Sequence, residues 1–379
     1  MKIFFFSDNY SPATNGIVTY ILNTKKELEA RGHIVYVFAP DFPNQKDEEN
    51  VFRFKSASFL LIEQDRMINP LASASKLLPN IIPDIIHCQL FLTSFPALKL
   101  AKIHNTPTLV TYHTLFSDYL FRINPSLLTP TKSLVSLLTR WYFNKFDVAL
   151  TPSGKSEQAL LNAQVKTKVI KLNNGINLKP FARATDKLFK EKFNIKGDYI
   201  LSISTLDTGK NVHLAIEALP KVLSKFPHLS LVIAGRGNED KNLKALAKKL
   251  HLEKNIYFVG FLTKGEAASA YQGAKFTLEL SQVDNLPTVV MEASAAGKPI
   301  IALRDLAIED LIKENVSGLL INKADSDELA DLMVKLLSDN NLLEKLSDGS
   351  KEMSKSFSIE NHVDKLEKIY REQICIKKS

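Results

Sequence analysis

Residues 275–297 read KFTLELSQVDNLPTVVMEASAAG and contain a strand, a loop and the beginning of a helix. KFTLELS is apolar enough for a buried strand, and VDNLP is typical of a turn. A helix can begin near Pro287, because the first turn of a helix needs no N–H from its proline. Asp284 then lies in the loop after the strand, and Glu292 lies on the helix. Two acids placed in this way can accept hydrogen bonds from the hydroxyls of a polyhydroxylated ligand. A structural role for both is the alternative.

The same strand-loop-helix rhythm recurs along the whole chain. Short apolar runs without polar alternation are typical of parallel strands that helices cover on both faces. The first set of runs is KIFFFS (2–7), IVYVFAP (34–40), PDIIHC (83–88), PTLVTYH (107–113) and FDVALTPS (146–153). The second set is YILSIS (199–204), LSLVIAG (229–235), NIYFVG (255–260), KFTLELS (275–281), KPIIAL (298–303) and GLLI (318–321).

The two sets predict two doubly wound α/β domains, separated by the polar segment ARATDKLFKEKFNIKG that follows residue 181. With 379 residues the chain exceeds the size at which a single core stops growing, about 250–300 residues. Two such domains are expected to turn the carboxyl ends of their strands toward a shared ligand-binding cleft. The alternative is one dinucleotide-binding domain with a catalytic domain. SDNYSPATNG contains only Gly16, so the G-x-G-x-x-G fingerprint of that alternative is missing.

The net charge of +8 lies mainly in the N-terminal half. Residues 1–180 contain 20 Lys and Arg against 13 Asp and Glu, so seven of the eight excess positive charges lie there. Such a half is suited to anionic lipid, phosphorylated ligands or nucleic acid, and a merely solvated surface stays open. Because the basic residues are scattered and no recognition module appears, we expect no nucleic-acid partner.

Cysteine and hydropathy patterns indicate the compartment. Cys88 and Cys375 are too few for a disulfide framework, which favours a reducing compartment. MKIFFFSD is shorter than a signal-peptide core, and no run approaches the roughly 18–20 apolar residues of a membrane span. We therefore expect a cytoplasmic protein that can touch a membrane from the side. No H-E-x-x-H, C-x-x-C or P-loop motif appears, and no metal site is expected.

Three further residues follow predicted strands. Gly16 begins a helix whose N–H groups can bind phosphate, although a simple turn residue explains it equally well. His113 ends the strand PTLVTYH, where it can bond a sugar hydroxyl or play a structural role. Lys210, in the loop TLDTGKN, can reach phosphate oxygens or be an ordinary exposed lysine. His87 has more apolar neighbours, which favours a core role, whereas His362 falls in a polar helical pattern.

Together these motifs resemble the retaining, nucleotide-sugar-dependent glycosyltransferases of family four, which have the GT-B fold. The resemblance implies that Gly16 contacts the donor diphosphate and that His113, in T-Y-H-T, lies beside the transferred sugar. Asp284 and Glu292 match two acids separated by seven residues, the first near the sugar hydroxyls and the second on the nucleotide ribose. The donor is then a substrate, expected to be UDP-glucose, and the family needs no metal cofactor for catalysis.

The resemblance also implies further donor contacts and the domain boundaries. NNGIN (173–177) resembles the hinge of the family, and the last helix is expected to cross back to the first domain. The domains are then residues 1–180 with 358–379, which bind the acceptor, and residues 181–357, which bind the donor. The donor contacts expected besides those above are Lys210, Thr205, the base-binding turn Val259, Gly260 and Phe261, and Asn285 and Leu286 after the first acid.

Two departures from the family pattern concern the donor site. The family usually has G-R-L-x-x-E-K, whereas STLDTGK has Thr205 in place of the arginine and Gly209 in place of the acid. Loss of a bidentate guanidinium weakens diphosphate binding by about 1.5–3 kcal/mol if nothing compensates. Asp284 replaces the usual glutamate and has a shorter reach.

The N-terminal half is similar to bacterial diacylglycerol glucosyltransferases, which implies a membrane lipid as the acceptor and a peripheral location on the inner face of the cell membrane. SLLTPTKSLVSLLTRWYFNKF (126–146) agrees with this, because it mixes leucines with Lys132, Arg140, Trp141 and Lys145, as an interfacial helix does. An ordinary core-facing helix is the alternative. Alternative functions are a mannosyl- or glucosyltransferase with a polysaccharide, polyprenyl-linked or soluble acceptor, and a non-catalytic binding protein.

Overall fold

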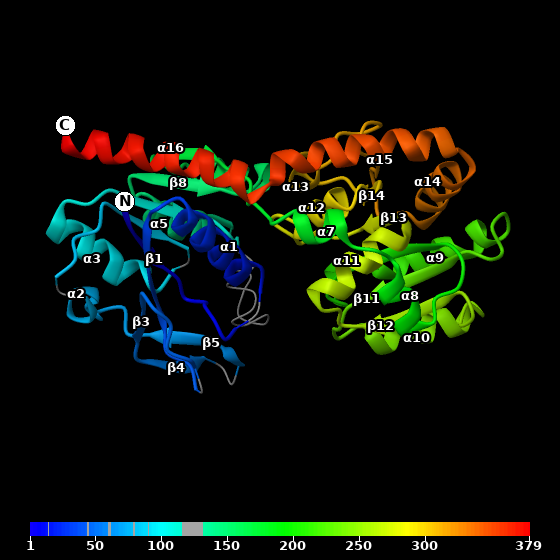
Figure 1. Ribbon diagram of the computed structural model, residues 1–379, viewed down its shortest axis with the longest axis horizontal. Coiled ribbons are helices and arrows are strands. Elements are labelled where there is room, and N and C mark those ends of the chain that lie inside the picture. Colours follow the sequence, from blue (N-terminus) through cyan, green and yellow to red (C-terminus); the bar gives the residue numbers. More distant parts are fainter. Residues whose placement is uncertain (14, 44, 60–61, 79, 90, 116–131) are drawn as a thin grey trace. The chain divides into compact units, whose positions relative to one another are not determined.

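The computed structural model describes the chain except residues 14, 44, 60–61, 79, 90 and 116–131, and the side chains of residues 59, 62–65 and 132 are also not described (Figure 1). The chain forms two compact units. The first comprises Met1–Gly175 and Ile359–Ser379, and the second comprises Ile176–Ser358. The division thus falls five residues before the boundary expected after residue 180.

The first unit is built on a seven-stranded parallel sheet in the order β3-β2-β1-β6-β7-β8-β9. The strands of this sheet are β1 (Lys2–Phe6), β2 (Ile34–Pro40), β3 (Val51–Phe54), β6 (Ile85–Cys88), β7 (Thr108–Thr111), β8 (Val148–Thr151) and β9 (Lys168–Lys171). A separate antiparallel pair consists of β4 (Ser56–Phe59) and β5 (Ile62–Ile68). Among the described residues of the unit, the helices are α1 (Gly16–Ala30), α2 (Ala74–Leu77), α3 (Ser94–His104), α5 (Lys132–Phe143), α6 (Gly154–Asn162) and α16 (Ile359–Lys378).

Alternate residues of the buried strands supply two cores, one on each face of the sheet. In β1, Ile3 and Phe5 pack with α1 and α16, whereas Phe4 and Phe6 pack with α3, α5 and α6. The helix α16 contributes Val363 to the first of these cores, and Figure 1 shows it beside α1. A chain segment at the far end of the sequence therefore completes the core that β1 begins.

The second unit repeats this plan with a six-stranded parallel sheet in the order β12-β11-β10-β13-β14-β15. Its strands are β10 (Tyr199–Ile203), β11 (Ser230–Ala234), β12 (Ile256–Gly260), β13 (Ala274–Glu279), β14 (Ile300–Leu303) and β15 (Gly318–Ile321). Its helices are α7 (Lys179–Arg183), α8 (Lys187–Phe193), η1 (Thr208–Lys210), α9 (Val212–Leu223), α10 (Asp240–Lys249), α11 (Lys264–Gly273), α12 (Thr288–Ala295), α13 (Leu306–Glu309), α14 (Ser326–Ser338), α15 (Asn340–Ser354) and η2 (Lys355–Phe357).

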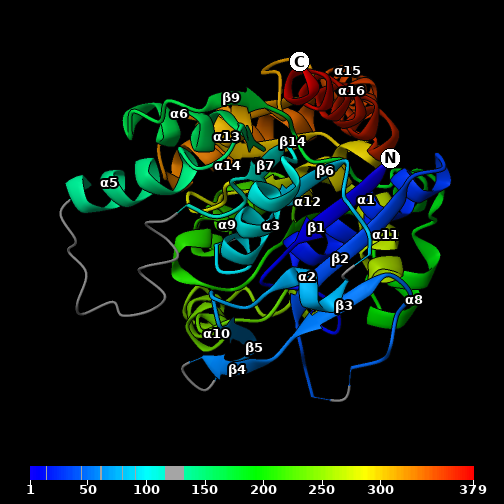
Figure 2. The same cartoon turned by 90° about the vertical axis from the view of Figure 1, so that its left-hand side faces the viewer.

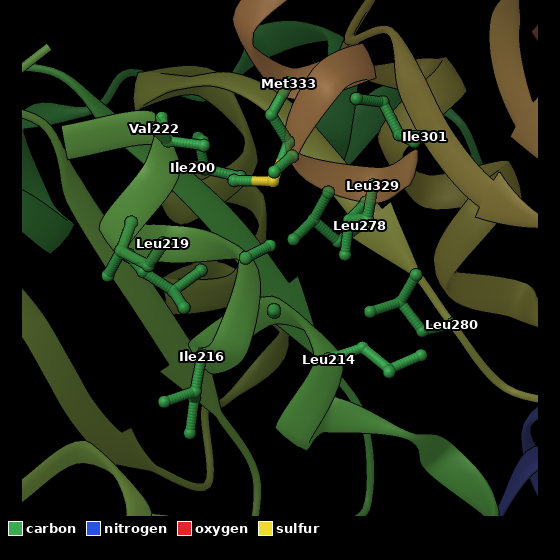
Figure 3. Close-up of a cluster of buried hydrophobic side chains, with 14 of the residues drawn as sticks. Ile200, Leu214, Ile216, Leu219, Val222, Leu278, Leu280, Ile301, Leu329 and Met333 are labelled. Carbon is green, nitrogen blue, oxygen red and sulfur yellow. The ribbon is translucent and has the colours of Figure 1, made fainter. Parts of the chain in front are cut away.

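The helices of the second unit cover both faces of its sheet. On one face, α9 and α14 pack Leu219 and Met333 against Ile200 and neighbouring strand residues (Figure 3). On the other face, α7, α8, α11 and α12 pack against Leu201 and Val232. Polar side chains fix several helix starts. For example, Thr263 caps α11 in a reciprocal pair with Glu266.

Each sheet has one point at which the strand order reverses, between β1 and β6 in the first unit and between β10 and β13 in the second. The loops that leave the two central strands diverge to opposite faces there, and open α/β sheets bind ligands in the resulting crevice. In the second unit these loops contain Lys210 and Asp284, and in the first unit they lead to Gly16 and Gln89. The loops at these two points are therefore the expected ligand-binding positions.

Candidate functional site

An ion pair joins the two loops at the reversal point of the second sheet. Lys210 Nζ lies 2.6 Å from Asp284 Oδ1 and 2.5 Å from Asp284 Oδ2. Lys210 ends the short helix η1 after β10, and Asp284 lies in the loop between β13 and α12. The lysine side chain is the more buried partner. This arrangement holds one cation and one carboxylate where a doubly wound sheet binds ligands.

Backbone contacts keep these two loops close together. Gln282 N donates to Gly209 O at 3.2 Å, and Asn211 Nδ2 donates to Leu280 O at 3.0 Å. A Cβ on Gly209 would lie 2.5 Å from Val283 Cγ1, so a larger residue here requires the exposed Val283 side chain to move. Gly209 thus packs closely against Val283.

A third loop, after β11, brings a second cation to the same end of the sheet. Leu206 N donates to Arg236 O at 3.0 Å, so Arg236 lies one strand away from exposed Thr205. Gly235 and Gly237 flank it, and a Cβ on either glycine would come within 2.3 Å of the backbone oxygen of Ser204 or Leu206. The side chain of Arg236 is exposed. Sequence reasoning missed this residue, although a basic residue between two glycines directly after a strand was a usable signal.

Glu292 lies on α12 and is oriented by a tyrosine from α11. Tyr271 Oη donates to Glu292 Oε2 at 3.2 Å, and the tyrosine is almost fully buried. Burial raises the pKa of Glu292 to about 7, against the opposing effects of this hydrogen bond and of Lys264. Near neutral pH, Glu292 can therefore accept hydrogen bonds from hydroxyls as a carboxylate or donate one hydrogen bond as a carboxylic acid.

A third acid, Glu279, was not singled out from the sequence. It is the last residue of β13, only 4% exposed, and its Oε1 accepts from Ser281 N at 3.0 Å. Burial and the charge of Asp284 raise its pKa to about 7, whereas Lys210 lowers it. Glu279 and Tyr271 also line one small pocket with apolar side chains of β10, β13 and α12. The available signal was a glutamate inside an otherwise apolar strand.

The remaining donor residues expected from the sequence lie on the loops of the second unit. Gly260 ends β12 with a φ of +71°, and its carbonyl accepts from Gly235 N at 2.8 Å. Phe261, which follows, is 68% exposed, and Val259 packs partly against the core. Leu286 also packs partly on the core, and Asn285 is half-buried beside Asp284. The turn thus presents an exposed aromatic ring beside backbone in a left-handed conformation.

In the first unit, Gly16 is the first residue of α1. The Asn15 side chain caps this helix by accepting from Val18 N at 3.0 Å. A Cβ on Gly16 would have no neighbouring atom within 4 Å, so packing does not demand a glycine here. The N–H groups of a helix start are a common binding site for anions.

His113 contacts the side chains of Gln89 and Tyr20 in the first unit. Its Nε2 lies 2.8 Å from Gln89 Oε1, and its ring stands edge-on to the ring of Tyr20 at a centroid distance of 4.8 Å. Burial and the neighbouring His362 lower its pKa to about 3, so the imidazole is neutral at physiological pH.

Two other histidines lie in the core beside this group. His87 is fully buried between Tyr370 Oη at 2.6 Å and Thr111 Oγ1 at 2.7 Å, in agreement with the expected core role. The expectation that His362 has polar surroundings is wrong. It is buried and its Nδ1 donates to Asn173 O at 2.8 Å, because α16 packs one stripe of its mainly polar surface against the first sheet.

The helix α5 presents an apolar stripe to solvent. Leu134, Leu137, Leu138 and Trp141 follow helical spacing and are exposed, Leu137 by 57% and Trp141 by 47%. Figure 2 shows α5 beside α6. Arg140 Nε of α5 donates to the carbonyl oxygen of Ala163, the residue that follows α6, at 2.8 Å. Lys145 Nζ lies 4.2 Å from the centre of the Trp141 ring. Lys132 begins the helix, but its side chain lies outside the described part.

Within the described part of the chain, no helix combines the length and the apolar character that spanning a membrane requires. No three His, Cys, Asp or Glu side chains in the same part of the chain are grouped so that they could hold a metal ion.

Comparison with solved structures identifies the fold. HepE from Anabaena, solved with UDP and glucose, aligns with a TM-score of 0.74 at 16% identity over 98% of this chain and 100% of that chain. Sucrose-phosphate synthase from Thermosynechococcus elongatus aligns with a TM-score of 0.78 at 18% identity over 99% and 100%. The two parallel sheets are thus those of a GT-B glycosyltransferase fold.

Comparison with protein families identifies the family. The model described as Glycosyltransferase Family 4 matches residues 14–179, and the model described as Glycosyl transferases group 1 matches residues 184–353. The chain therefore belongs to these glycosyltransferases. It is 28% identical to the alpha-monoglucosyldiacylglycerol synthase of Streptococcus pneumoniae, over 84% of this chain and 75% of that protein. It is 24% identical to the synthase of the same name from Acholeplasma laidlawii, over 99% and 98%.

The buried acid Glu279 predicts a pH-dependent stability difference. Its pKa rises from 4.5 in the unfolded chain to about 7 in the folded chain, so the folded state binds this proton more tightly. Its contribution to the free energy of unfolding is therefore complete at acidic pH and is lost as the pH rises through that window. In urea unfolding, the free energy of unfolding of E279Q relative to that of the wild type should increase by about 2–3 kcal/mol from acidic to mildly alkaline pH.

The matched control is E253Q, which changes an exposed glutamate of the same unit. It should follow the wild type across the pH range. A stability difference between E279Q and the wild type that stays constant with pH would contradict the burial of an ionisable group at this position.

Proposed function

We propose that this protein transfers glucose from UDP-glucose to the hydroxyl of a membrane lipid such as diacylglycerol, with retention of configuration. The observation that carries the proposal is the Lys210–Asp284 ion pair at the reversal point of the second sheet, followed on the next helix by Glu292. A cation suits a diphosphate, and carboxylates suit hydroxyls, so the group fits a nucleotide sugar. The names of the two monoglucosyldiacylglycerol synthases support glucose and diacylglycerol.

In this proposal, Lys210 and Arg236 bind the donor diphosphate. The Lys210 ammonium divides its charge between Asp284 and the phosphate oxygens, and Arg236 compensates for the arginine that is missing at Thr205. The bond between the anomeric carbon and the β-phosphate oxygen breaks, and the same carbon forms a bond to the acceptor oxygen. The hydroxyl proton of the acceptor passes to the departing phosphate oxygen. Negative charge develops on the departing diphosphate, where the two cations stabilise it.

The acids and the histidine recognise hydroxyl groups. Glu292, which Tyr271 orients, accepts hydrogen bonds from the ribose hydroxyls, and such hydrogen bonds favour its charged form. Asp284 accepts hydrogen bonds from hydroxyls of the transferred sugar. His113 offers a neutral imidazole, which can accept a hydrogen bond from a sugar hydroxyl because its pKa is far below neutral.

The lipid acceptor is proposed from α5. Its exposed stripe of leucines and Trp141, with Lys145 stacked over the indole ring, has the composition of a helix that lies in a membrane interface. Tyr142 and Phe143, by contrast, are buried and attach the helix to its unit. The enzyme would then act as a peripheral protein at the surface that holds its acceptor.

The first test is the release of UDP or GDP from a panel of nucleotide sugars, with and without diacylglycerol in anionic vesicles. We expect release from UDP-glucose only when the lipid is present, and an α-linked product by NMR, since the donor is α-linked. A β-linked product would refute retention. Release without lipid would indicate another acceptor, and silence across the panel in protein that binds UDP would indicate a non-catalytic binding protein.

The role of Arg236 predicts a selective loss of donor affinity. R236A should raise the KM for UDP-glucose and the Kd for UDP about tenfold, the effect of losing one charge-assisted hydrogen bond. The control R183A removes an exposed arginine of α7 in the same unit. Adding T205R to R236A should restore part of the affinity. Unchanged UDP binding by R236A would remove Arg236 from the diphosphate site.

The exposed stripe on α5 predicts salt-sensitive membrane binding. Wild-type protein should sediment with vesicles that contain phosphatidylglycerol, and less so at high salt. The variant L137S/W141S should bind at least tenfold more weakly, because each large apolar side chain contributes about 1.5–3 kcal/mol when it leaves water. L188S, an exposed leucine of α8, is the control. Equal sedimentation of the double variant and the wild type would contradict the assignment.

A further inference from the structure

The buried carboxyl group of Glu279 belongs to the strand that leads to the ion pair, but the reaction proposed above does not use it. Glu279 is the last residue of β13, and Asp284 lies in the loop that leaves this strand. Glu279 is almost fully buried, whereas the side chain of Asp284 is partly exposed. Of these two acids, Glu279 is therefore the one that the fold withdraws from water.

Hydrogen bonds connect Glu279 to the loop that carries the aspartate of the ion pair. Ser281 N donates to Glu279 Oε1 at 3.0 Å, and Val283 N donates to Ser281 Oγ at 3.3 Å. Between them, Gln282 N donates to Gly209 O at 3.2 Å and joins the same loop to η1. The two loops of the ion pair are thus linked to each other, and one of them folds back on the carboxyl group of Glu279.

Two charged groups act on this carboxyl group. Lys210, on η1, lowers the pKa of Glu279, and Asp284 raises it. Tyr271, on α11, lines a small pocket with Glu279 and donates its hydroxyl to Glu292 on α12. The side chains that β10 and β14 contribute to this pocket are isoleucines. Burial has the largest effect and raises the pKa of Glu279 to about 7, so the group is partly protonated near neutral pH.

A bound diphosphate changes this balance of charges. When Glu279 is ionised, the single ammonium group of Lys210 interacts with two carboxylates. A diphosphate beside Lys210 adds negative charge and draws on the same ammonium group. Nearby like charges favour the neutral form of an acid, and so does burial. The acid that binds a proton most readily is therefore Glu279, because burial already favours its neutral form.

We propose that Glu279 takes up a proton from the solvent when the diphosphate of a nucleotide sugar binds beside Lys210. The proton neutralises the buried carboxylate, so the ammonium group no longer has to balance it and can interact more strongly with the phosphate oxygens. This inference rests on the proposed function, because it needs an anionic donor at the ion pair. Glu279 acts through Lys210 and needs no contact with the donor.

Calorimetry of the whole protein measures this proton directly. The heat of binding UDP-glucose slightly above neutral pH, without a lipid acceptor, is compared in buffers of different ionisation enthalpy and gives the number of protons taken up. UDP-glucose is the probe because its diphosphate is a diester that does not titrate near neutral pH. We expect the wild type to take up about half a proton more than E279Q, the result of a rise of about one unit in the pKa of Glu279. Both proteins keep Glu292, so its own proton change cancels in this difference.

The pH dependence of donor affinity is a second readout, which a merely structural role of Glu279 would not change. E279Q imitates the neutral acid at every pH. From acidic to alkaline pH, the Kd of the wild type for UDP-glucose, relative to that of E279Q, should therefore rise by up to about tenfold, since the ionised carboxylate competes with the donor for Lys210. The control E253Q, at an exposed glutamate of the same unit, should follow the wild type in both experiments.

The outcomes separate this inference from the proposed function. Binding of UDP-glucose with equal proton uptake in the wild type and E279Q, or with a ratio of Kd values that stays constant with pH, would overturn the role of Glu279 and leave the donor unaffected. If the wild type does not bind UDP-glucose at all, the proposed function fails and this inference fails with it. E279M is the second variant if E279Q folds poorly, because it also removes the ionisable group at similar side-chain length.

Discussion

The ligand-binding end of the second sheet is organised around one electrostatic contact, the ion pair between Lys210 and Asp284. Two loops leave neighbouring strands in opposite directions at the reversal point of the sheet. The pair connects them, together with the hydrogen bonds from Gln282 to Gly209 and from Asn211 to Leu280. The pair is only partly buried, so its partners stay hydrated and can exchange contacts with a charged ligand at modest cost. An interaction that organises the loops is thus also one that a diphosphate can share.

The two units use the same architecture for different chemistry. In the second unit the strand ends carry charges, namely two cations and the acids Glu279, Asp284 and Glu292. In the first unit they carry the neutral pair Gln89 and His113 within a mostly apolar core. Burial raises the pKa of Glu279 and Glu292 and lowers that of His113, because it disfavours the charged form in every case. One physical effect therefore gives weak acids on one sheet and a neutral base on the other.

Local sequence patterns were sufficient for the architecture but not for the pairing of side chains. The continuous apolar runs identified both parallel sheets, since a strand buried on both faces must be apolar throughout. The rule that ligands bind at strand ends placed Lys210 and Asp284 near one another. It could not reveal that Gly209 packs on Val283, that Arg236 lies beside Thr205, or that Gln89 contacts His113. Such contacts join loops far apart in the chain. Glu279 and His362 were missed because the local sequence does not show that the fold buries these two polar residues.

The C-terminal helix α16 has a consequence for biosynthesis. The second unit is one continuous segment, whereas the first unit needs Ile359–Ser379 to complete the core that β1 begins. His33 connects the residue before β1 to α16, because it contacts both the amino group of Met1 and the carboxylate of Glu367. Residues Ile359–Ser379 follow the whole second unit in the sequence, so the ribosome synthesises them after it. The first unit, whose synthesis begins earlier, can therefore finish folding only after the second unit has been made, and the uncovered apolar face of its sheet is the part of the nascent chain that needs protection from aggregation.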